Sequence, residues 1–431
     1  MTCSLLDPKS RVMHPAPQIV TLGCRLNLAE SEMIRPLLAD RDTVVVNSCA
    51  VTGEAVKQTR AAIRRLRRAR PEAELVVTGC AATIDPAGFA AMPEVDRVVA
   101  NDVKTAPASW GRDAAPVVAF AGHARALVEV QNGCDHACTF CIIPQGRGPS
   151  RSIDAAAVVE RVRGLVAAGH REVVLTGVDV TSYAGGLGGL VERVLAETVT
   201  ERLRLSSIDS MEVDDRLFEL IAGEARVMPH LHLSLQAGND LILKRMKRRH
   251  LRADAVRLVE RLKARRDVAI GADLIAGFPT ESEAMFADTL ALIGDCNVVH
   301  AHIFPFSARA GSPAARMPQV EPEVRRARAA RLRAAGAERK AAWLRGLIGS
   351  MQAVLVERPG DRGHAPGFAE VCLPSPLTAG SIASVDITDV RNGCLLGHPR
   401  ESGDPSRGVR VGDIGEIGSR FRGNDGLGSM A

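Results

Sequence analysis

Short apolar segments alternate with amphipathic segments over most of the chain. Near the N-terminus, apolar runs at 18–22, 43–47 and 74–78 have the length and the β-branched content of buried strands. The stretches between them are amphipathic, including an Arg-rich one at 54–70. Strands that alternate with helices predict a parallel sheet, so we expect an α/β fold for this part of the chain.

A second alternating series follows, and its strands are again separated by helical patterns. The candidate strands are 127–131, 172–176, 203–208, 230–235, 268–275 and 298–304. This pattern predicts a partial (β/α) barrel. In such barrels the chemistry takes place at the C-terminal ends of the strands.

The C-terminal third changes character. A helical pattern at 319–348 precedes strand candidates at 351–356, 368–372 and 382–389, which predict a small β-barrel. A stretch rich in Ala, Pro and Gly at 101–124 predicts a linker or a domain boundary. The predicted domains are a disordered extension (1–16), an N-terminal sheet domain (17–124), the barrel (125–348), the small β-barrel (349–397) and a disordered tail (398–431).

Composition narrows the class of protein. The 431 residues are 46% hydrophobic, as expected for a chain that buries a full core. Neither a membrane helix nor a signal peptide is expected from the sequence, so we expect a cytoplasmic protein without membrane contact. The net charge is only +5, but the basic residues are concentrated in three clusters, at 60–70, 244–250 and 325–340. These clusters fit an RNA-binding surface, although solvated helix faces explain them equally well.

Three cysteines form a C-x3-C-x2-C motif directly after the first barrel strand. Cys134, Cys138 and Cys141 can ligate three irons of a cubane cluster and leave the fourth iron open, as in radical S-adenosylmethionine (SAM) enzymes. Structural zinc is the competing interpretation, but it needs four ligands, and His136 lies awkwardly inside the same loop. Ten cysteines in a chain without a secretory signal favour metal binding over a disulfide framework.

Three further cysteines each follow a predicted strand of the N-terminal sheet. Cys24, Cys49 and Cys80 should converge, because the C-terminal ends of parallel strands lie along one edge. This geometry predicts a second three-thiolate cluster. The remaining cysteines show no such relation and are interpreted as structural or incidental, namely Cys3, Cys296, Cys372 and Cys394.

Several stretches resemble the methylthiotransferases, a family of radical SAM enzymes. They include TLGCRLNLAESE, VVNSCAVT, NGCDHACTFCIIPQGRGPSRS, HLHLSLQAGNDLILKRMKRRH and ADLIAGFPTES, and they occur in the family's order. The resemblance implies an N-terminal cluster domain, a radical SAM core and a C-terminal TRAM domain that binds RNA. Within the family, these stretches are most similar to the bacterial branch that acts on N6-threonylcarbamoyladenosine beside the tRNA anticodon.

The resemblance also implies roles and partners. Cys24, Cys49 and Cys80 would hold an auxiliary [4Fe–4S] cluster that presents the sulfur, and the C-x3-C-x2-C motif would hold the [4Fe–4S] cluster that cleaves SAM. One SAM would methylate the sulfur, and a second would supply the radical that acts on adenine C2. The partners would be the anticodon stem-loop of tRNA, a reductant such as flavodoxin or ferredoxin, and a sulfur donor.

Other candidate site residues lie at predicted strand ends or in basic stretches. The candidate SAM contacts are Phe140, Gly177, Asp179, Ser206, Ser207, Ser234, Gln236, Asp273 and Gly277. The candidate contacts to RNA or cofactor are Arg147, Arg151, Lys244, Lys247 and Arg248.

Two alternative functions stay open at this point. A sister enzyme of the family would modify isopentenyladenosine in tRNA or an aspartate of a ribosomal protein. A protein of another class would be a non-catalytic, zinc-stabilised RNA-binding protein. The zinc protein would be colourless, whereas the enzyme would be brown and carry about eight irons in two cubane clusters.

Overall fold

The structure is a computed structural model that describes residues 16–114, 120 and 122–400. The two segments predicted to be disordered lie almost wholly outside these residues. Within the described part of the chain, no helix is long and apolar enough to cross a membrane.

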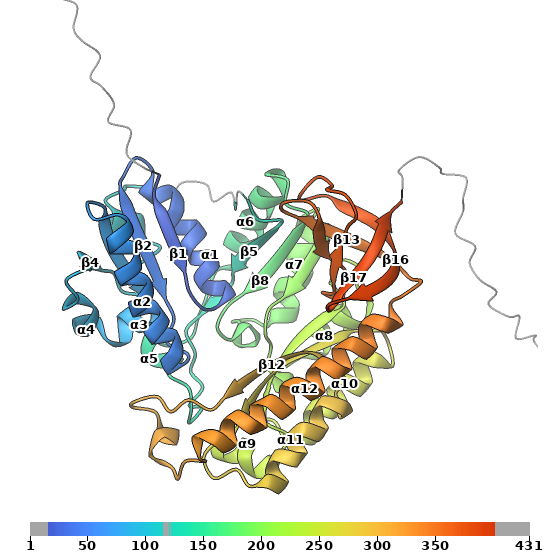
Figure 1. Cartoon of the computed structure of the whole chain (residues 1–431). Helices are drawn as coiled ribbons and strands as arrows, with labels where there is room; N and C mark the ends of the chain where they lie inside the picture. The colour runs from blue at the N-terminus through green and yellow to red at the C-terminus, as the bar shows by residue number, and fades with distance from the viewer. Residues whose placement is uncertain (1–15, 115–119, 121, 401–431) are drawn as a thin grey trace, which may run out of the picture. The chain divides into compact units, whose positions relative to one another are not determined.

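The N-terminal part forms a parallel sheet of four strands in the order β1–β2–β3–β4 (Figure 1). The strands are β1 (Gln18–Thr21), β2 (Thr43–Ser48), β3 (Glu74–Gly79) and β4 (Arg97–Val98). The helices between them are α1 (Arg25–Ile34), η1 (Arg35–Leu38), α2 (Gly53–Ala69), α3 (Cys80–Ile84) and α4 (Pro86–Ala90). The first three strands match the predicted apolar runs, and the Val and Leu side chains of β2 and β3 are fully buried, whereas β1 is only half-buried.

The first part of the segment predicted as a linker or domain boundary, 101–124, packs on the N-terminal sheet domain. Residues 107–110 form η2 (Pro107–Trp110), and Trp110 packs against Leu37 and Val76 of the first sheet layer. Lys104 is also fully buried, because it pairs with Glu30 of α1 at 2.5 Å. Composition alone did not reveal these packed side chains.

Six parallel strands form the partial barrel, as predicted. They are β5 (Arg125–Glu129), β8 (Glu172–Thr176), β9 (Arg202–Leu205), β10 (His230–Gln236), β11 (Ala269–Ala276) and β12 (Val298–Pro305). Hydrogen bonds order them as β5–β8–β9 and β10–β11–β12, and a parallel bridge between Ile208 and Leu233 joins the two halves. Between β5 and β8, an antiparallel pair of β6 (Gln131–Asn132) and β7 (Arg151–Ser152) borders the cysteine loop.

Helices cover the outer face of this barrel (Figure 1). They are α6 (Ala155–Ala167), α7 (Leu187–Glu197), α8 (Asp215–Gly223), α10 (Arg252–Lys263), α11 (Glu283–Asp295) and α12 (Pro322–Gly346). The short helices α5 (Ile143–Arg147) and α9 (Asp240–Met246) flank the cysteine loop, and η3 (Val180–Ser182), η4 (Ser210–Glu212) and η5 (Pro313–Arg316) complete the set. One apolar core joins the outward side chains of the strands to these helices.

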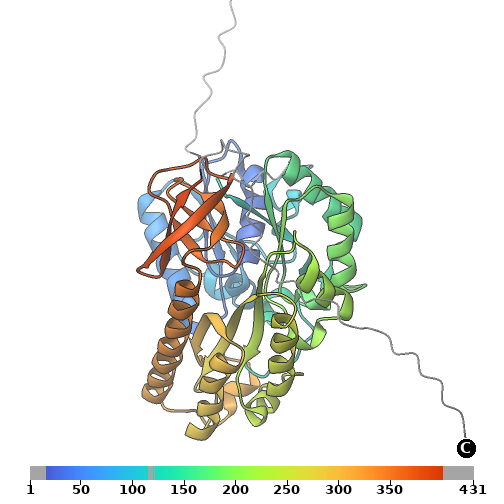
Figure 2. The same ribbon diagram turned by 90° about the vertical axis from the view of Figure 1, so that its right-hand side faces the viewer.

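The C-terminal strands close into the predicted β-barrel, which follows the end of α12 (Figure 2). They are β13 (Met351–Glu357), β14 (Arg362–His364), β15 (Glu370–Cys372), β16 (Ile382–Arg391) and β17 (Cys394–Pro399). The sequence did not indicate β14 or β17, which contain little apolar periodicity. A disulfide joins Cys372 to Cys394, a pairing that the sequence did not predict.

Candidate iron–sulfur and SAM site

Cys24, Cys49 and Cys80 follow three neighbouring parallel strands of the first sheet. Cys24 caps the N-terminus of α1, Cys49 follows β2, and Cys80 begins α3 directly after β3. Gly79 precedes Cys80 with φ of +95°, and a Cβ there would lie 2.4 Å from the backbone of Ser48. Only glycine therefore lets β3 turn at this point and present Cys80.

Two asparagines fix the loops that carry these cysteines. Asn27 Nδ2 donates to the carbonyl oxygens of Leu22 (2.7 Å) and Ser48 (3.0 Å). Asn47 Nδ2 donates to the carbonyl of Asn27 at 2.9 Å. Burial raises the pKa of the Cys49 thiol, and the nearby Cys24 and Cys80 raise it further. The three thiols follow neighbouring strands at one edge of the sheet, as ligands of one cluster must.

The C-x3-C-x2-C loop lies between β6 and α5 and is held by α9. The backbone N–H and the hydroxyl of Thr139 donate to the carbonyls of Met246 (3.1 Å) and Arg245 (2.8 Å). Burial raises the pKa of Cys134 to about 12, with Asp179 and the other two thiols adding to the shift. Burial likewise raises the pKa of Cys141 to about 11. Bound iron would supply the positive charge that these buried thiolates need.

Arg248 places a positive charge next to Cys138 of this loop. Its guanidinium lies 3.6 Å from Cys138 Sγ and donates to Asp209 Oδ2 (2.7 Å) and to the carbonyl of Ser234 (2.9 Å). Arg248 thus connects the cysteine loop to the C-terminal end of β10.

The two cysteine triads lie beside each other. A Cβ on Gly146 of α5 would lie 3.1 Å from Cys80 Cβ, so the helix that follows the motif loop packs directly on a cysteine of the other triad. Cys80 also contributes to the raised pKa of Cys141. If each triad holds a cluster, a group held at one cluster could be delivered to a reaction that starts at the other.

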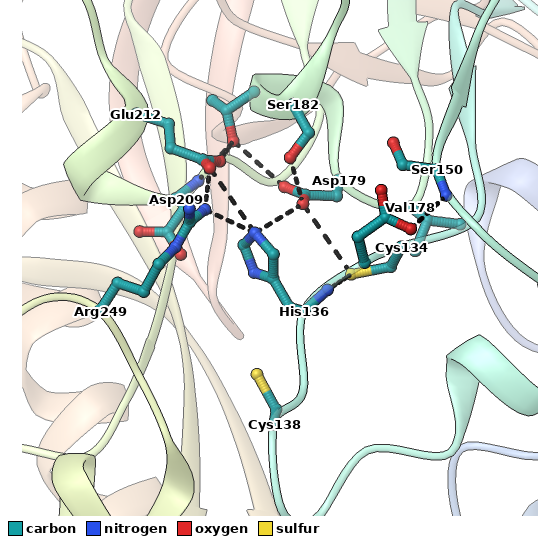
Figure 3. A network of polar contacts seen from close by, with 12 residues as sticks. Cys134, His136, Cys138, Ser150, Val178, Asp179, Ser182, Asp209, Glu212 and Arg249 are labelled. Carbon is teal, nitrogen blue, oxygen red and sulfur yellow. Dashed lines mark hydrogen bonds and ion pairs between the residues drawn. The ribbon is translucent and has the colours of Figure 1, made fainter.

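His136 belongs to a polar network next to Cys134 (Figure 3). Its Nε2 lies 3.2 Å from Asp179 and 3.6 Å from Glu212, and Asp179 Oδ2 lies 3.9 Å from Cys134 Sγ. Ligand atoms of Cys134, His136 and Asp179 all lie within 4.8 Å of one another, so this corner could hold a metal ion. Such an ion would use one cysteine and leave the other five unexplained, whereas two cubane clusters use all six.

Comparisons with known proteins decide between these interpretations. The radical SAM superfamily matches residues 128–293, and the uncharacterized protein family UPF0004 matches residues 17–100. The threonylcarbamoyladenosine tRNA methylthiotransferase MtaB of Rickettsia prowazekii is 44% identical over 88% of this chain and 97% of its own length. The chain belongs to the methylthiotransferase family of radical SAM enzymes.

Other relatives of this methylthiotransferase carry two different names. MtaB of Chlamydia pneumoniae is 34% identical over 88% of the chain and 97% of that protein. The tRNA-2-methylthio-N(6)-dimethylallyladenosine synthase of Erythrobacter litoralis is 30% identical over 89% of the chain and 97% of that protein. The predicted enzyme class, the two [4Fe–4S] clusters and SAM are confirmed by this membership.

The predicted SAM contacts of the methylthiotransferase differ in their burial, their hydrogen bonds and the space around them. Ser206 is buried and its hydroxyl has no hydrogen-bond partner among the described residues, which fits a group that awaits a ligand. Phe140 packs edge-on against Phe278, with ring centroids 6.5 Å apart. Gly177 and Gly277 leave no room for a side chain, because a Cβ would lie 2.6 Å from the Gln131 carbonyl or 2.3 Å from Arg325 Cγ.

The other predicted contacts lie on or near the barrel strands. Ser207, Ser234 and Gln236 are half-buried at the ends of their strands. Asp179 belongs to the His136 network, and Asp273 lies between two histidines. All of these SAM contacts remain predictions.

Of the five predicted contacts to RNA or cofactor, two are enclosed in the protein and three are exposed. Arg147 is 3% exposed and bonds Glu30 and Asn27, so it cannot contact RNA. Burial alone would lower the pKa of Arg147, but Glu30 and, after it, Cys80 and Cys24 raise it, which places Arg147 beside the auxiliary triad. Arg248 is similarly enclosed next to Cys138. Arg151, Lys244 and Lys247 are exposed.

Most of the basic clusters are engaged within the protein. In the first cluster, Arg60, Arg64, Arg67 and Arg70 pair with acidic side chains. In the third, Arg328 and Arg331 pair with acidic residues, and Arg325, Arg333 and Arg339 donate to oxygens of the chain. For these two clusters, contacts within the protein or a solvated helix face explain the basic residues better than an RNA-binding surface does.

Sequence reasoning missed the residues that join the two cysteine-bearing parts. Glu30 of α1 accepts from Lys104 and from Arg147, and Asn132 bonds both Glu30 and Arg147. Burial alone would raise the pKa of Glu30, but Lys104 and Arg147 outweigh it and lower the pKa. The sequence did contain an indication of these contacts, because Asn27 and Glu30 are polar residues one helical turn apart beside Cys24.

Proposed function

We propose that this enzyme adds a methylthio group to C2 of N6-threonylcarbamoyladenosine next to the anticodon of tRNA, in the cytoplasm. The observation that carries the reaction class is the packing of α5, the helix directly after the C-x3-C-x2-C loop, on Cys80 of the other triad, through Gly146. The substrate follows from similarity to relatives named for it, including the 44% identical Rickettsia protein.

The residues of the chain have separable roles in this reaction. Cys134, Cys138 and Cys141 would hold the cluster that binds SAM, and Cys24, Cys49 and Cys80 the auxiliary cluster. When bound, these groups supply a transferable sulfur and a radical that removes hydrogen from an aromatic C–H, which no side-chain base can deprotonate at neutral pH. Arg248 holds Cys138 from one side, and Arg147 contributes positive charge beside Cys24 and Cys80.

The proposal includes partners that the chemistry requires. A reductant such as flavodoxin or ferredoxin would supply electrons, and a sulfur donor would renew the transferred atom. The exposed Lys244 and Lys247 are the proposed phosphate contacts to the anticodon stem-loop. We also propose the domain boundaries given by the sequence, with the small β-barrel as a TRAM-like RNA-binding domain.

Analysis of tRNA nucleosides tests the substrate. Mass spectrometry of tRNA from a strain that lacks the gene should show loss of the methylthio form of threonylcarbamoyladenosine. Threonylcarbamoyladenosine without the methylthio group should accumulate. Persistence of that methylthio nucleoside would refute the proposal. Loss of methylthio-isopentenyladenosine instead would favour the second candidate substrate, isopentenyladenosine in tRNA. The name of the Erythrobacter relative supports this candidate.

A further inference from the structure

Three polar side chains form a cluster on the inner face of the barrel that the cysteine chemistry does not use. Asp273 of β11 lies between His232 of β10, at 3.0 Å, and His302 of β12, at 3.3 Å. The rings of the two histidines face each other at 4.6 Å between centroids. We call His232, Asp273 and His302 the inner triad.

The strand alternation fixes which way the inner triad points. Ala301 faces α12, since its Cβ lies 2.7 Å from the position of a Cβ on Gly336, so its neighbour His302 points to the opposite face. Ala272 and Leu274 likewise belong to the apolar core under the helices, which turns Asp273 inward. Gly271 leaves the room that His232 needs, because a Cβ there would lie 2.5 Å from His232 Nδ1.

The inner triad lies two residues before the point at which Arg248 connects the cysteine loop to β10. Arg248 links Cys138 to the carbonyl of Ser234 at the end of β10. His232 precedes Ser234 by two residues on the same face, which is about 7 Å along a strand. To reach the inner triad, a substituent of a purine bound beside the cysteines would have to extend about this distance along β10.

The inner triad is built for polar recognition. Asp273 engages His302 through Nδ1, which leaves Nε2 without a partner among the described residues, and the side chain of His302 is 58% exposed. Held in this way, the imidazole presents a nitrogen that can donate or accept a hydrogen bond according to its protonation. Asp273 itself accepts from both histidines, and these bonds keep its pKa low despite the burial that would raise it.

We infer that the inner triad recognises the polar substituent of the modified adenosine, with His302 as the contacting residue and Asp273 and His232 as positioning residues. This inference rests on the proposed function and names its specificity determinant. A threonylcarbamoyl group carries a carboxylate, a hydroxyl and urea N–H groups, which pair with imidazole and carboxylate. A dimethylallyl group has no polar atom and would leave the inner triad unpaired, at a cost in binding.

Binding of three RNAs tests the inference without turnover. The full-length protein would be titrated with anticodon stem-loops that differ only in the adenosine beside the anticodon: unmodified, threonylcarbamoylated or isopentenylated. Wild-type protein should prefer the threonylcarbamoyl RNA over the unmodified RNA by about 10- to 100-fold. His302→Phe should lose this preference and bind the isopentenyl RNA relatively better, whereas His302→Gln should keep part of the preference.

Two results would overturn the inference. In the first, His302→Phe keeps the wild-type preference for the threonylcarbamoyl RNA. In the second, metal analysis finds one bound divalent ion other than iron that both His302→Phe and Asp273→Asn lose, which would make the inner triad a metal site. Failure of the proposed function is distinct, because wild-type protein itself would then neither prefer nor methylthiolate the threonylcarbamoyl RNA.

Discussion

At the scale of single residues, Glu30 connects the first sheet to the cysteine-motif segment. Its carboxylate is 1% exposed and lies 2.5 Å from Lys104 Nζ and 2.8 Å from Arg147 Nη1. Removing one member of such a buried set leaves the others as uncompensated charges. The set therefore contributes to stability only while it is complete.

Glu30→Gln should lower the free energy of unfolding by about 3–5 kcal/mol, because two buried cations lose their counter-charge. Chemical denaturation followed by circular dichroism measures this change. Glu160→Gln is the control, since Glu160 is exposed and pairs with Arg163 on the surface of α6, where a salt bridge contributes at most about 1 kcal/mol. Equal effects of the two substitutions would contradict the assignment.

At the scale of elements, Glu172 ties three strands of the barrel together. It begins β8 and pairs with Arg125 of β5 at 2.7 Å and with Arg204 of β9 at 2.9 Å. Burial alone would raise the pKa of Glu172, but Arg204 and Arg125 outweigh it and lower the pKa to about 2. The carboxylate is therefore charged in the folded protein at neutral pH.

This lowered pKa predicts a pH dependence of stability. Because the pKa falls from 4.5 to about 2 on folding, the charged carboxylate stabilises the fold above about pH 4.5, and this contribution is lost as the pH falls towards 2. The contribution is on the order of 3 kcal/mol. Thermal unfolding between pH 7 and pH 3 should show a steeper loss for wild type than for Glu172→Gln; parallel curves would contradict the prediction.

Helix α9 ends in two exposed lysines that lack partners in the described part of the chain. If Lys244 and Lys247 contact phosphates, Lys244→Ala with Lys247→Ala should reduce the slope of log affinity against log salt by about 1.4 for single-stranded RNA. Filter binding of the anticodon stem-loop at several salt concentrations measures the slope. Arg64→Ala is the control, because Arg64 pairs with Glu94. An unchanged slope in the double variant would exclude these contacts.

At the scale of the whole molecule, the sequence predicted the long strands of the first sheet and of the partial barrel and pointed to both cysteine triads, but it predicted few of the contacts between them. Apolar runs such as 74–78 became β3 because buried parallel strands need continuous apolar residues. The pairing of Arg147 with Glu30 spans 117 residues and leaves no local pattern. The same holds for the inner triad, whose members come from three strands.

Iron content and SAM cleavage of two triple variants test the central claim, that each cysteine triad holds its own cluster. Reconstituted wild-type protein should contain about eight irons, and C134A/C138A/C141A and C24A/C49A/C80A about four each. Only the second variant should still cleave SAM to 5′-deoxyadenosine, and neither should methylthiolate RNA. Full iron content and SAM cleavage in C134A/C138A/C141A would contradict the account.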